Sequence, residues 1–270
     1  MTDYRSVSQL KEYRQCGYRY YLSRLAKDKD GNRIWQRPAA WFPQGLAFHE
    51  AAEWWENSHR TGTLEEAQAV YTESYDKHTN RLTAETPNLE AWFDSSWRYP
   101  PEKDIERRYL IGLEQVEKYL KYCLEKKPKE VLFENKEGNP FVEQPFEFEL
   151  DGVKVRGYID AVYWDDEKNC WAVRDYKTGK SPGEATQLAV YGYAVNQEYD
   201  LGITHGDYWM AKTGKPTVRY DIREWTEQQL TDIFGLLDED IRSERFDPKP
   251  SPDNCKFCSV AAACEYAAIS

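Results

Sequence analysis

The sequence has 270 residues, of which 36 are basic and 47 acidic, so its formal net charge is −11. This length allows one large domain or two small ones, and the acidic balance argues against a protein that coats nucleic acid through its overall charge. Aromatic residues make up 15% of the chain, and because large rings bury a large area each, we predict a folded, soluble domain.

Two further classes of protein are excluded by simple patterns. No stretch approaches the roughly 20 apolar residues that a membrane span needs, and the first residues show no apolar core of a secretory signal. We therefore expect a cytoplasmic protein whose six cysteines stay reduced.

Helices are predicted for the first half of the chain. The segment from Ser6 to Gln9 fits a capping box that opens an aromatic-rich helix reaching about Leu25. A second capping box, from Thr63 to Glu66, opens another helix. The later helices of this half are expected at about 45–59, 63–80 and 102–124.

From Val142 the hydrophobic period changes to two, which is typical of strands. Asp151-Gly152 is a strong hairpin turn between the first two of them. The expected elements are strands at 142–150, 153–164 and 170–176, a helix at 184–198, strands at 203–211 and 217–221, and a last helix at 226–242.

This order predicts a mixed α/β (α+β) fold in a single domain over residues 1–270. We expect a mainly helical part at 1–135, a catalytic sheet and helix at 140–225, and a helix with a cysteine-bearing tail at 226–270. No internal repeat is visible.

Candidate catalytic residues lie in the second and third strands. Asp175 and Lys177 are two residues apart and so share one face of a strand, and Asp160 on the neighbouring strand can reach the same place. Two carboxylates and a lysine suit a Mg²⁺ or Mn²⁺ site with an activated water. On spacing alone, however, surface ion pairing is the more common explanation for a D-x-K pattern.

Residues outside these strands change that balance. Gln187 and Tyr191 are four apart on the next predicted helix, so they share a face that can point to the same strand end. His49 lies on an earlier predicted helix. Taken singly it is more often a packed core histidine than a metal ligand.

Four motifs in this order resemble the RecB-like branch of the PD-(D/E)XK nucleases. They are G-x-x-x-H at 45–49, G-x-I-D at 157–160, D-x-K-T-G-K at 175–180 and Q-x-x-x-Y at 187–191. The resemblance covers nearly the whole chain and implies an αβββαβ core, a Mg²⁺ or Mn²⁺ cofactor and hydrolysis of phosphodiester bonds in DNA.

The resemblance also implies roles for individual residues. His49, Asp160, Asp175 and the backbone carbonyl of Tyr176 become metal ligands, and Lys177 becomes the catalytic lysine. Gln187 and Tyr191 become supports of the site and contacts to the DNA strand. Two further positions are weaker candidates: Glu143 as a support behind the ligands and Lys180 as a phosphate contact.

A second group of candidate ligands consists of cysteines. Cys255, Cys258 and Cys264 follow a turn-rich segment, and Cys16 in the first predicted helix is a possible fourth ligand. From ligand types alone, structural Zn²⁺ and a [4Fe–4S] cluster are hard to separate, and free thiols are also possible.

One N-terminal and three C-terminal cysteines around such a core resemble the iron–sulfur staple of the Cas-four-type CRISPR-associated exonucleases and of the AddB nuclease domain. That resemblance implies a [4Fe–4S] cluster joining both ends of the chain. Cys123 and Cys170 match no ligand position and are expected as small buried apolar groups.

We therefore predict a metal-dependent DNA exonuclease that carries a [4Fe–4S] cluster and acts on single-stranded DNA or free ends. The alternative is a non-catalytic DNA-binding subunit of a CRISPR adaptation or recombination complex. A sequence-specific restriction endonuclease would share the D-x-K core but not the four cysteines. The tryptophans of two loops more often pad a helical region than stack on bases: Trp35, Trp41, Trp92 and Trp97.

Overall fold

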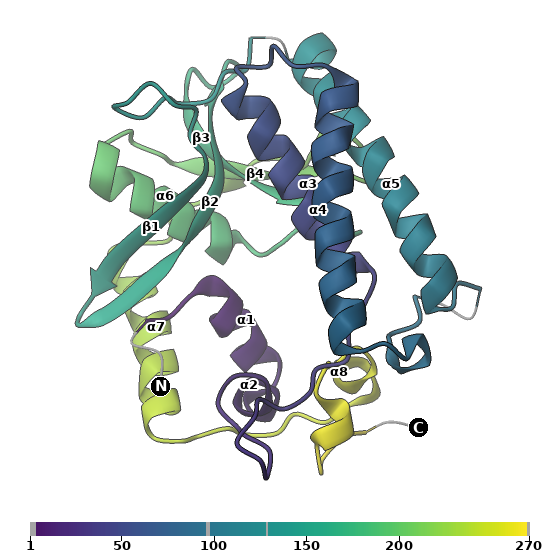
Figure 1. Ribbon diagram of the computed structural model, residues 1–270. Helices are drawn as coiled ribbons and strands as arrows, with labels where there is room; N and C mark the ends of the chain where they lie inside the picture. The colour runs from purple at the N-terminus through teal and green to yellow at the C-terminus, as the bar shows by residue number, and fades with distance from the viewer. Residues whose placement is uncertain (1–3, 96–97, 128, 269–270) are drawn as a thin grey trace.

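A mixed sheet forms the centre of the computed structural model, which describes residues 4–95, 98–127 and 129–268 (Figure 1). The strands are β1 (Val142–Leu150), β2 (Val153–Asp165), β3 (Cys170–Lys177), β4 (His205–Met210), β5 (Lys215–Pro216) and β6 (Tyr220–Asp221). They are ordered β1-β2-β3-β4-β5, with β6 also paired to β4. β3 and β4 run parallel, and the other paired strands run antiparallel.

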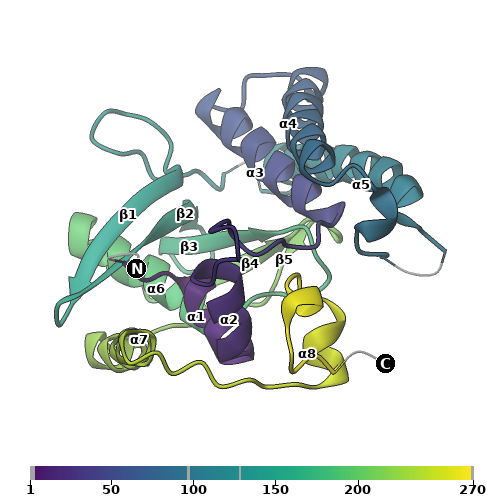
Figure 2. The ribbon, with the colours of Figure 1, turned by 60° about the horizontal axis from the view of Figure 1, so that its bottom comes forward.

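Helices cover both faces of this sheet (Figure 2). They are α1 (Val7–Gln15), α2 (Gly17–Arg24), α3 (Trp41–Asn57), α4 (Leu64–Glu85), α5 (Pro101–Lys121), α6 (Ala185–Tyr199), α7 (Glu227–Arg242) and α8 (Pro252–Lys256). One hydrophobic core joins α3, α4 and α5 to the sheet, and the other joins it to α1, α6 and α7. The order α5-β1-β2-β3-α6-β4 agrees with the helix, three strands, helix and strand that the sequence predicts.

Alternation along β3 directs side chains into both layers. Tyr176 packs in the core shared with α3 and α5, whereas Val173 packs in the core shared with α6. Asp175 and Lys177 therefore point toward the α6 layer, near the carboxyl end of a strand that leads into the crossover to β4. This is the sheet edge at which the site forms.

Most local signals for caps and turns are confirmed; at α1 the Ser6 hydroxyl accepts from the Gln9 N–H, but the Gln9 amide donates to the Tyr4 carbonyl and does not close a capping box. The hydroxyl of Thr63 accepts from the Glu66 N–H and the Glu66 carboxylate accepts from the Thr63 N–H, as a capping box requires. Thr226 and Gln229 form the same reciprocal pair at α7. Asp151, with a φ of 46°, makes the tight turn between β1 and β2.

The prediction of a single N-terminal helix is wrong. The helix is interrupted at Cys16, whose φ of −166° and ψ of 115° are extended, so that α1 and α2 are separate helices. A Cβ on the next residue, Gly17, would lie 2.9 Å from the backbone nitrogen of Asp247. The close approach of the C-terminal segment therefore requires a glycine at this position, where the two helices meet at an angle. Hydrophobic periodicity along the sequence predicts neither feature.

Other boundaries differ by a few residues. α3 begins at Trp41 rather than Gly45, because Pro43 lies in the first helical turn, where its missing N–H costs no hydrogen bond. α4 continues to Glu85, beyond the predicted end near residue 80. The last predicted hairpin is reduced to two-residue strands, β5 and β6, on β4.

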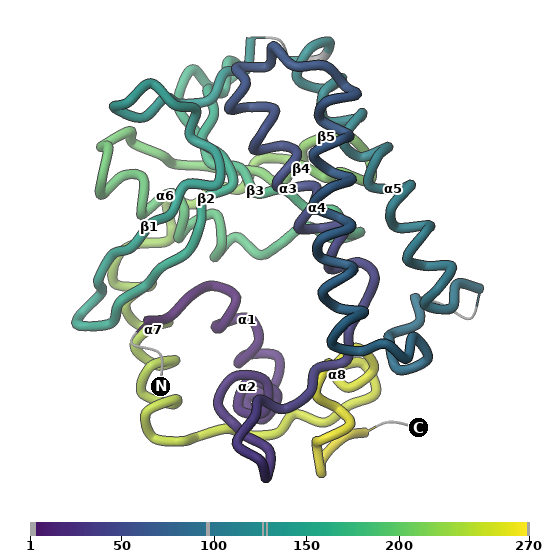
Figure 3. The backbone as a smooth tube through the Cα atoms, viewed as in Figure 1, coloured from purple at the N-terminus to yellow at the C-terminus, as the bar shows by residue number. Residues whose placement is uncertain are grey.

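The N-terminal helices α1 and α2 lie beside the C-terminal segment that follows α7, as the backbone trace also shows (Figure 3). The hydroxyl of Tyr13 donates to the carbonyl of Arg245 at 2.6 Å, and the rings of Tyr18 and Tyr266 meet edge to face at 4.9 Å. Among the described residues, none of the helices combines the length and the apolar character needed to cross a bilayer.

Candidate active site

Three acidic residues form a row across the first three strands. In the register of β1 with β2, Glu143 lies between Val142, which pairs with Ala161, and Gln144, which pairs with Ile159. The register of β2 with β3 ends at Ala161 and Arg174, one residue short of Asp160 and Asp175. Asp160 is 5% exposed and Asp175 1%. Glu143 has a φ of 48°, a left-handed conformation that is uncommon for residues other than glycine and concentrates at functional sites. The row thus places two buried aspartates and a half-buried glutamate at one sheet edge.

His49, from α3, completes one side of this row. Its Nδ1 atom lies 2.6 Å from Oε1 of Glu143 and 3.6 Å from Oδ2 of Asp160. One donor atom from each of these three residues lies within 4.8 Å of the others. An imidazole and two carboxylates are suitable ligands for a divalent cation. Glu143, expected only as a support, therefore joins the candidate ligands.

Asp175 and Lys177 share a strand face, as predicted, and the Lys177 ammonium lies against Oδ2 of Asp175. This oxygen is buried, and within the described part of the chain it has no hydrogen-bond partner of good geometry. Burial, together with the Asp160 carboxylate, raises the pKa of Asp175 to about 6, although Lys177 opposes the shift. A buried carboxylate oxygen whose partner is an ammonium ion is a suitable position for a second cation, such as a metal ion.

The same burial and neighbouring charges shift the pKa values of Asp160 and His49. Burial raises the pKa of Asp160, with His49 opposing and Glu143 adding to the shift. Burial alone would lower the pKa of His49, but the carboxylates of Asp160 and Glu143 raise it to about 9. The site therefore attracts positive charge, which is what a cation site requires.

Gln187 and Tyr191 reach the row from α6, as their spacing predicts. The Tyr191 hydroxyl lies 3.2 Å from Oδ1 of Asp160 and 3.4 Å from Oδ1 of Asp175. The Gln187 amide nitrogen donates to the Tyr191 oxygen at 3.0 Å. Both aspartates of the row thus face one hydroxyl.

Sequence reasoning missed Lys11 of α1. Its Nζ atom is 2.5 Å from Oε1 of Gln187. Burial and the positive charge of Lys177 lower the pKa of Lys11, while the acidic row opposes that shift. No motif contains this lysine, and a single lysine in an amphipathic helix carries no signal of its own.

Two predicted residues take less direct positions. The side chain of Tyr176 points to the opposite face, where its hydroxyl meets that of Tyr119 at 2.7 Å. Only its backbone faces the row, and its N–H donates to Oδ2 of Asp160 at 2.7 Å. Lys180 is exposed in the loop after β3. Its contact with a phosphate stays a prediction.

The four cysteines predicted as ligands line one small cavity between α2 and the C-terminal segment. None of the cysteines is in a disulfide. Within the described residues, no three of these thiols lie as close together as the donors of the His49 group. The cluster therefore stays a prediction. Cys123 is buried, as expected, whereas Cys170 is only half-buried.

The loop tryptophans divide as follows. Trp92 is fully buried and Trp41 stacks on Phe93 at 5.8 Å, so both pack, as favoured. Trp35 is 43% exposed, and its indole N–H donates to the Thr86 hydroxyl. Trp97 lies outside the described residues.

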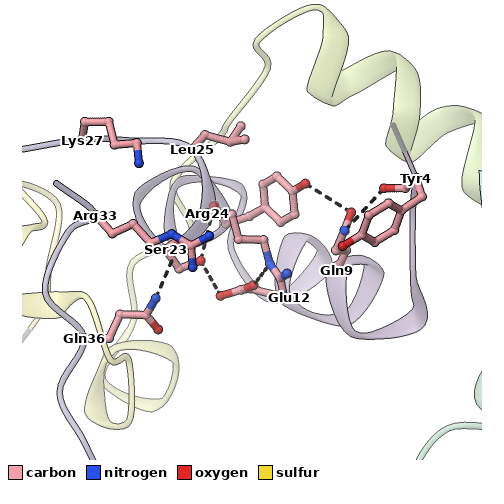
Figure 4. A pocket seen from close by; sticks show the side chains of 10 residues that line it. Tyr4, Gln9, Glu12, Ser23, Arg24, Leu25, Lys27, Arg33 and Gln36 are labelled. Carbon is pink, nitrogen blue, oxygen red and sulfur yellow. Dashed lines mark hydrogen bonds and ion pairs between the residues drawn. The ribbon is translucent and has the colours of Figure 1, made fainter. Parts of the chain in front are cut away.

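A larger cavity, of about 670 Å³, lies beside α1 and α2 (Figure 4). Glu12 lines it, with its carboxylate 2.5 Å from the Arg24 guanidinium. Lys27 and Arg33 also line it; both are exposed, and neither has an ion-pair partner among the residues described. In an acidic protein this cavity has basic walls. α1 borders both the cavity and, through Lys11, the acidic row.

Comparison with known proteins adds the following. The family model described as PD-(D/E)XK nuclease superfamily matches residues 4–265. The chain is 44% identical over 268 residues to the Gene 69 protein of Mycobacterium phage D29, with 96% of each chain covered. It is 42% identical to the Gene 69 protein of Mycobacterium phage L5, with 96% of this chain and 95% of that protein covered. A crystal structure of SSO0001, 21% identical, covers 70% of this chain and 80% of that one at a TM-score of 0.33, which is too low to support any conclusion.

Proposed function

The chain belongs to the PD-(D/E)XK nuclease superfamily, and we propose that it is a metal-dependent DNA exonuclease of the RecB-like kind. The observation that carries this proposal is the row of Glu143 and the buried Asp160 and Asp175, with Lys177 beside it. A protein that only bound DNA would have no need to bury adjacent carboxylates at the cost that their raised pKa values indicate.

The donor set fits Mg²⁺ or Mn²⁺. His49, Glu143 and Asp160 would hold the ion, with Asp175 beside them as a further carboxylate ligand. A bound divalent cation would supply stabilisation of the negative charge that develops on the scissile phosphate. We propose the backbone carbonyl of Tyr176 as a further ligand of the ion.

Lys177 has a different role from the acidic residues. Its ammonium lies against Asp175 and remains partly exposed, so it can hold the attacking water and stabilise the charge on the phosphate oxygens. Tyr191 holds the two aspartates from the α6 side. These residues orient the reacting groups, which is the main contribution a protein makes to phosphoryl transfer.

The basic cavity beside α1 supports a preference for DNA strands and their ends. A protein with a net charge of −11 needs a local basic surface to bind a polyanion. Lys27 and Arg33 provide one from the loop that follows α2, beside the helix pair whose Lys11 contacts Gln187. We propose that a single strand crosses this cavity on its way to or from the site.

We also propose that Cys16, Cys255, Cys258 and Cys264 hold a [4Fe–4S] cluster. The lining of one cavity by all four supports this assignment. The cluster would be structural, because these residues belong to the two chain ends and not to the acidic row.

Two substitutions test the catalytic assignment. We expect Asp160→Asn and Lys177→Met each to lower the cleavage rate by about 10²–10³-fold or more, the usual cost of losing a contact made in the transition state. Gel-shift binding of a labelled strand should remain measurable in Lys177→Met, because phosphate contacts elsewhere hold the DNA. If the wild-type protein binds the strand but does not cleave it, an accessory DNA-binding subunit would be favoured instead.

A further inference from the structure

Lys11 is the least expected residue near the acidic row. It comes from the first helix, and its ammonium is within 2.5 Å of the Gln187 side-chain oxygen. Gln187 in turn contacts Tyr191, which contacts Asp160 and Asp175. A continuous line of hydrogen bonds thus joins the N-terminal helix to both aspartates.

The chemistry of Lys11 fixes the direction of the first bond. A lysine ammonium can only donate, whereas a glutamine amide has one accepting and one donating end. Because Lys11 occupies the accepting end, the amide nitrogen of Gln187 must face Tyr191, to which it donates at 3.0 Å. Without a donor at this place the amide could rotate by half a turn at little cost.

The direction of the next bond follows from this one. Since the Tyr191 oxygen accepts from Gln187, the single hydroxyl proton is left to point at the aspartates, 3.2 and 3.4 Å away. A tyrosine hydroxyl is protonated at neutral pH, so this proton is available for the bond. The hydroxyl faces Oδ1 of both carboxylates, whereas Oδ2 of Asp160 accepts from the Tyr176 N–H and Oδ2 of Asp175 contacts the Lys177 ammonium.

We propose that Lys11 is a positioning residue for the metal site: by holding the oxygen of Gln187, it makes Tyr191 a donor to Asp160 and Asp175. This inference rests on the proposed function, because it assumes that these two aspartates bind the cation. Lys11 itself contacts neither aspartate in this role. It acts through two side chains.

The test is a double-mutant cycle with Mn²⁺ affinity, measured by calorimetry, as the main readout. We expect Lys11→Met to weaken Mn²⁺ binding by about 10-fold, the lower end for removal of a group behind a metal ligand. Tyr191→Phe should weaken it at least as much. In the Tyr191→Phe background, Lys11→Met should weaken Mn²⁺ binding by less than a further twofold or so, because the effect of Lys11 passes through the Tyr191 hydroxyl.

Two further variants separate positioning from general effects. Lys11→Arg keeps a donor for Gln187 and should bind Mn²⁺ within about twofold of the wild type. Arg14→Met removes a cation from an exposed position of α1 and should leave the affinity unchanged. Thermal unfolding of each variant without metal checks that the fold is retained.

The outcomes are distinct. Full, independent losses from Lys11→Met in both backgrounds would overturn the proposal and indicate a direct electrostatic or phosphate contact. Loss of Mn²⁺ binding in a folded Lys11→Arg variant, or an equal loss in Arg14→Met, would also overturn it. A wild type that binds Mn²⁺ with the expected cycle but cleaves no DNA would refute the proposed function and leave this inference standing.

Discussion

At the scale of single residues, the main feature is the burial of adjacent carboxylates. Asp160 and Asp175 are both almost fully buried and side by side, so each disfavours the charged form of the other. Lys177, His49 and the Tyr191 hydroxyl offset this repulsion only partly, as the raised pKa of Asp175 shows. Without a cation, the site therefore destabilises the fold.

This strain has a pH dependence with a definite sign. The pKa of Asp175 is about 6 in the folded chain, against 3.8 as its ordinary value. The contribution of a group with a raised pKa is fully present below the ordinary value and is lost as pH rises through the folded value. We expect Asp175→Asn to stabilise the chelator-treated protein at pH 7.5, by up to about 3 kcal/mol, and to change little at pH 4.

The measurement is thermal or denaturant unfolding of both proteins at the two pH values, with metal removed. A wild type that is more stable than Asp175→Asn at pH 7.5 would contradict this account. Excess Mn²⁺ serves as the control, since it should stabilise the wild type and not the variant.

The residue scale also shows which parts of the site a sequence can predict. His49, Asp160 and Lys177 were predicted because each lies in a motif whose spacing fits its helix or strand, and the structure brings them together. The close contact of Glu143 with His49 was not predicted, because its φ of 48° departs from regular strand alternation. Lys11 was missed because its importance arises only from tertiary contact.

At the scale of elements, the capping boxes and the β1–β2 turn were predictable because they depend on neighbours in the sequence. The break between α1 and α2 was not, because it is imposed by residues near 247, more than two hundred positions away. The break also determines where two side chains lie. With α1 and α2 set at an angle, Lys11 contacts Gln187 and Arg24 lines the cavity.

The cavity beside this helix pair gives a prediction at the same scale. We expect Lys27→Glu with Arg33→Glu to weaken the binding of a single strand and to reduce the slope of log affinity against log salt by about 1–2, since each phosphate contact contributes a slope of about 0.9 or less. Lys29→Glu, in the same exposed loop but outside the cavity lining, is the matched control. Fluorescence anisotropy at several salt concentrations measures both quantities.

Comparing the double variant with Lys29→Glu shows whether the cavity or only the charge of the loop attracts DNA. Equal weakening by Lys29→Glu alone would mean that the charge of the loop, and not the cavity, attracts DNA. An unchanged salt slope in the double variant would place the strand elsewhere.

At the scale of the whole molecule, the two chain ends pack together. Tyr13 contacts Arg245, and the N–H of Lys249 donates to the Cys16 sulfur at 3.4 Å. A cross-link between these ends would close a loop of about 240 residues and so remove much of the entropy of the unfolded chain. The proposed cluster would therefore stabilise the entire fold.

This role predicts a clear difference between cysteines. Protein purified without oxygen should be brown and contain about four irons per chain, the stoichiometry of the cluster. Cys16→Ala should lose the iron and much of the thermal stability, whereas Cys170→Ala, outside the cavity, should keep both. Iron analysis and visible absorption check this result. One zinc per chain would replace the proposed cluster with a zinc site, and unchanged metal and stability in Cys16→Ala would refute a staple of either kind.

The most direct test of the central claim compares a labelled linear DNA strand with a closed circle of the same sequence. The account predicts that the wild type with Mn²⁺ shortens the linear strand progressively and degrades the circle far more slowly. Chelation of the metal, or Asp175→Asn, should stop the reaction. Cleavage that persists in Asp175→Asn, or that proceeds equally on the circle at fixed positions, would contradict a metal-dependent exonuclease built on the acidic row.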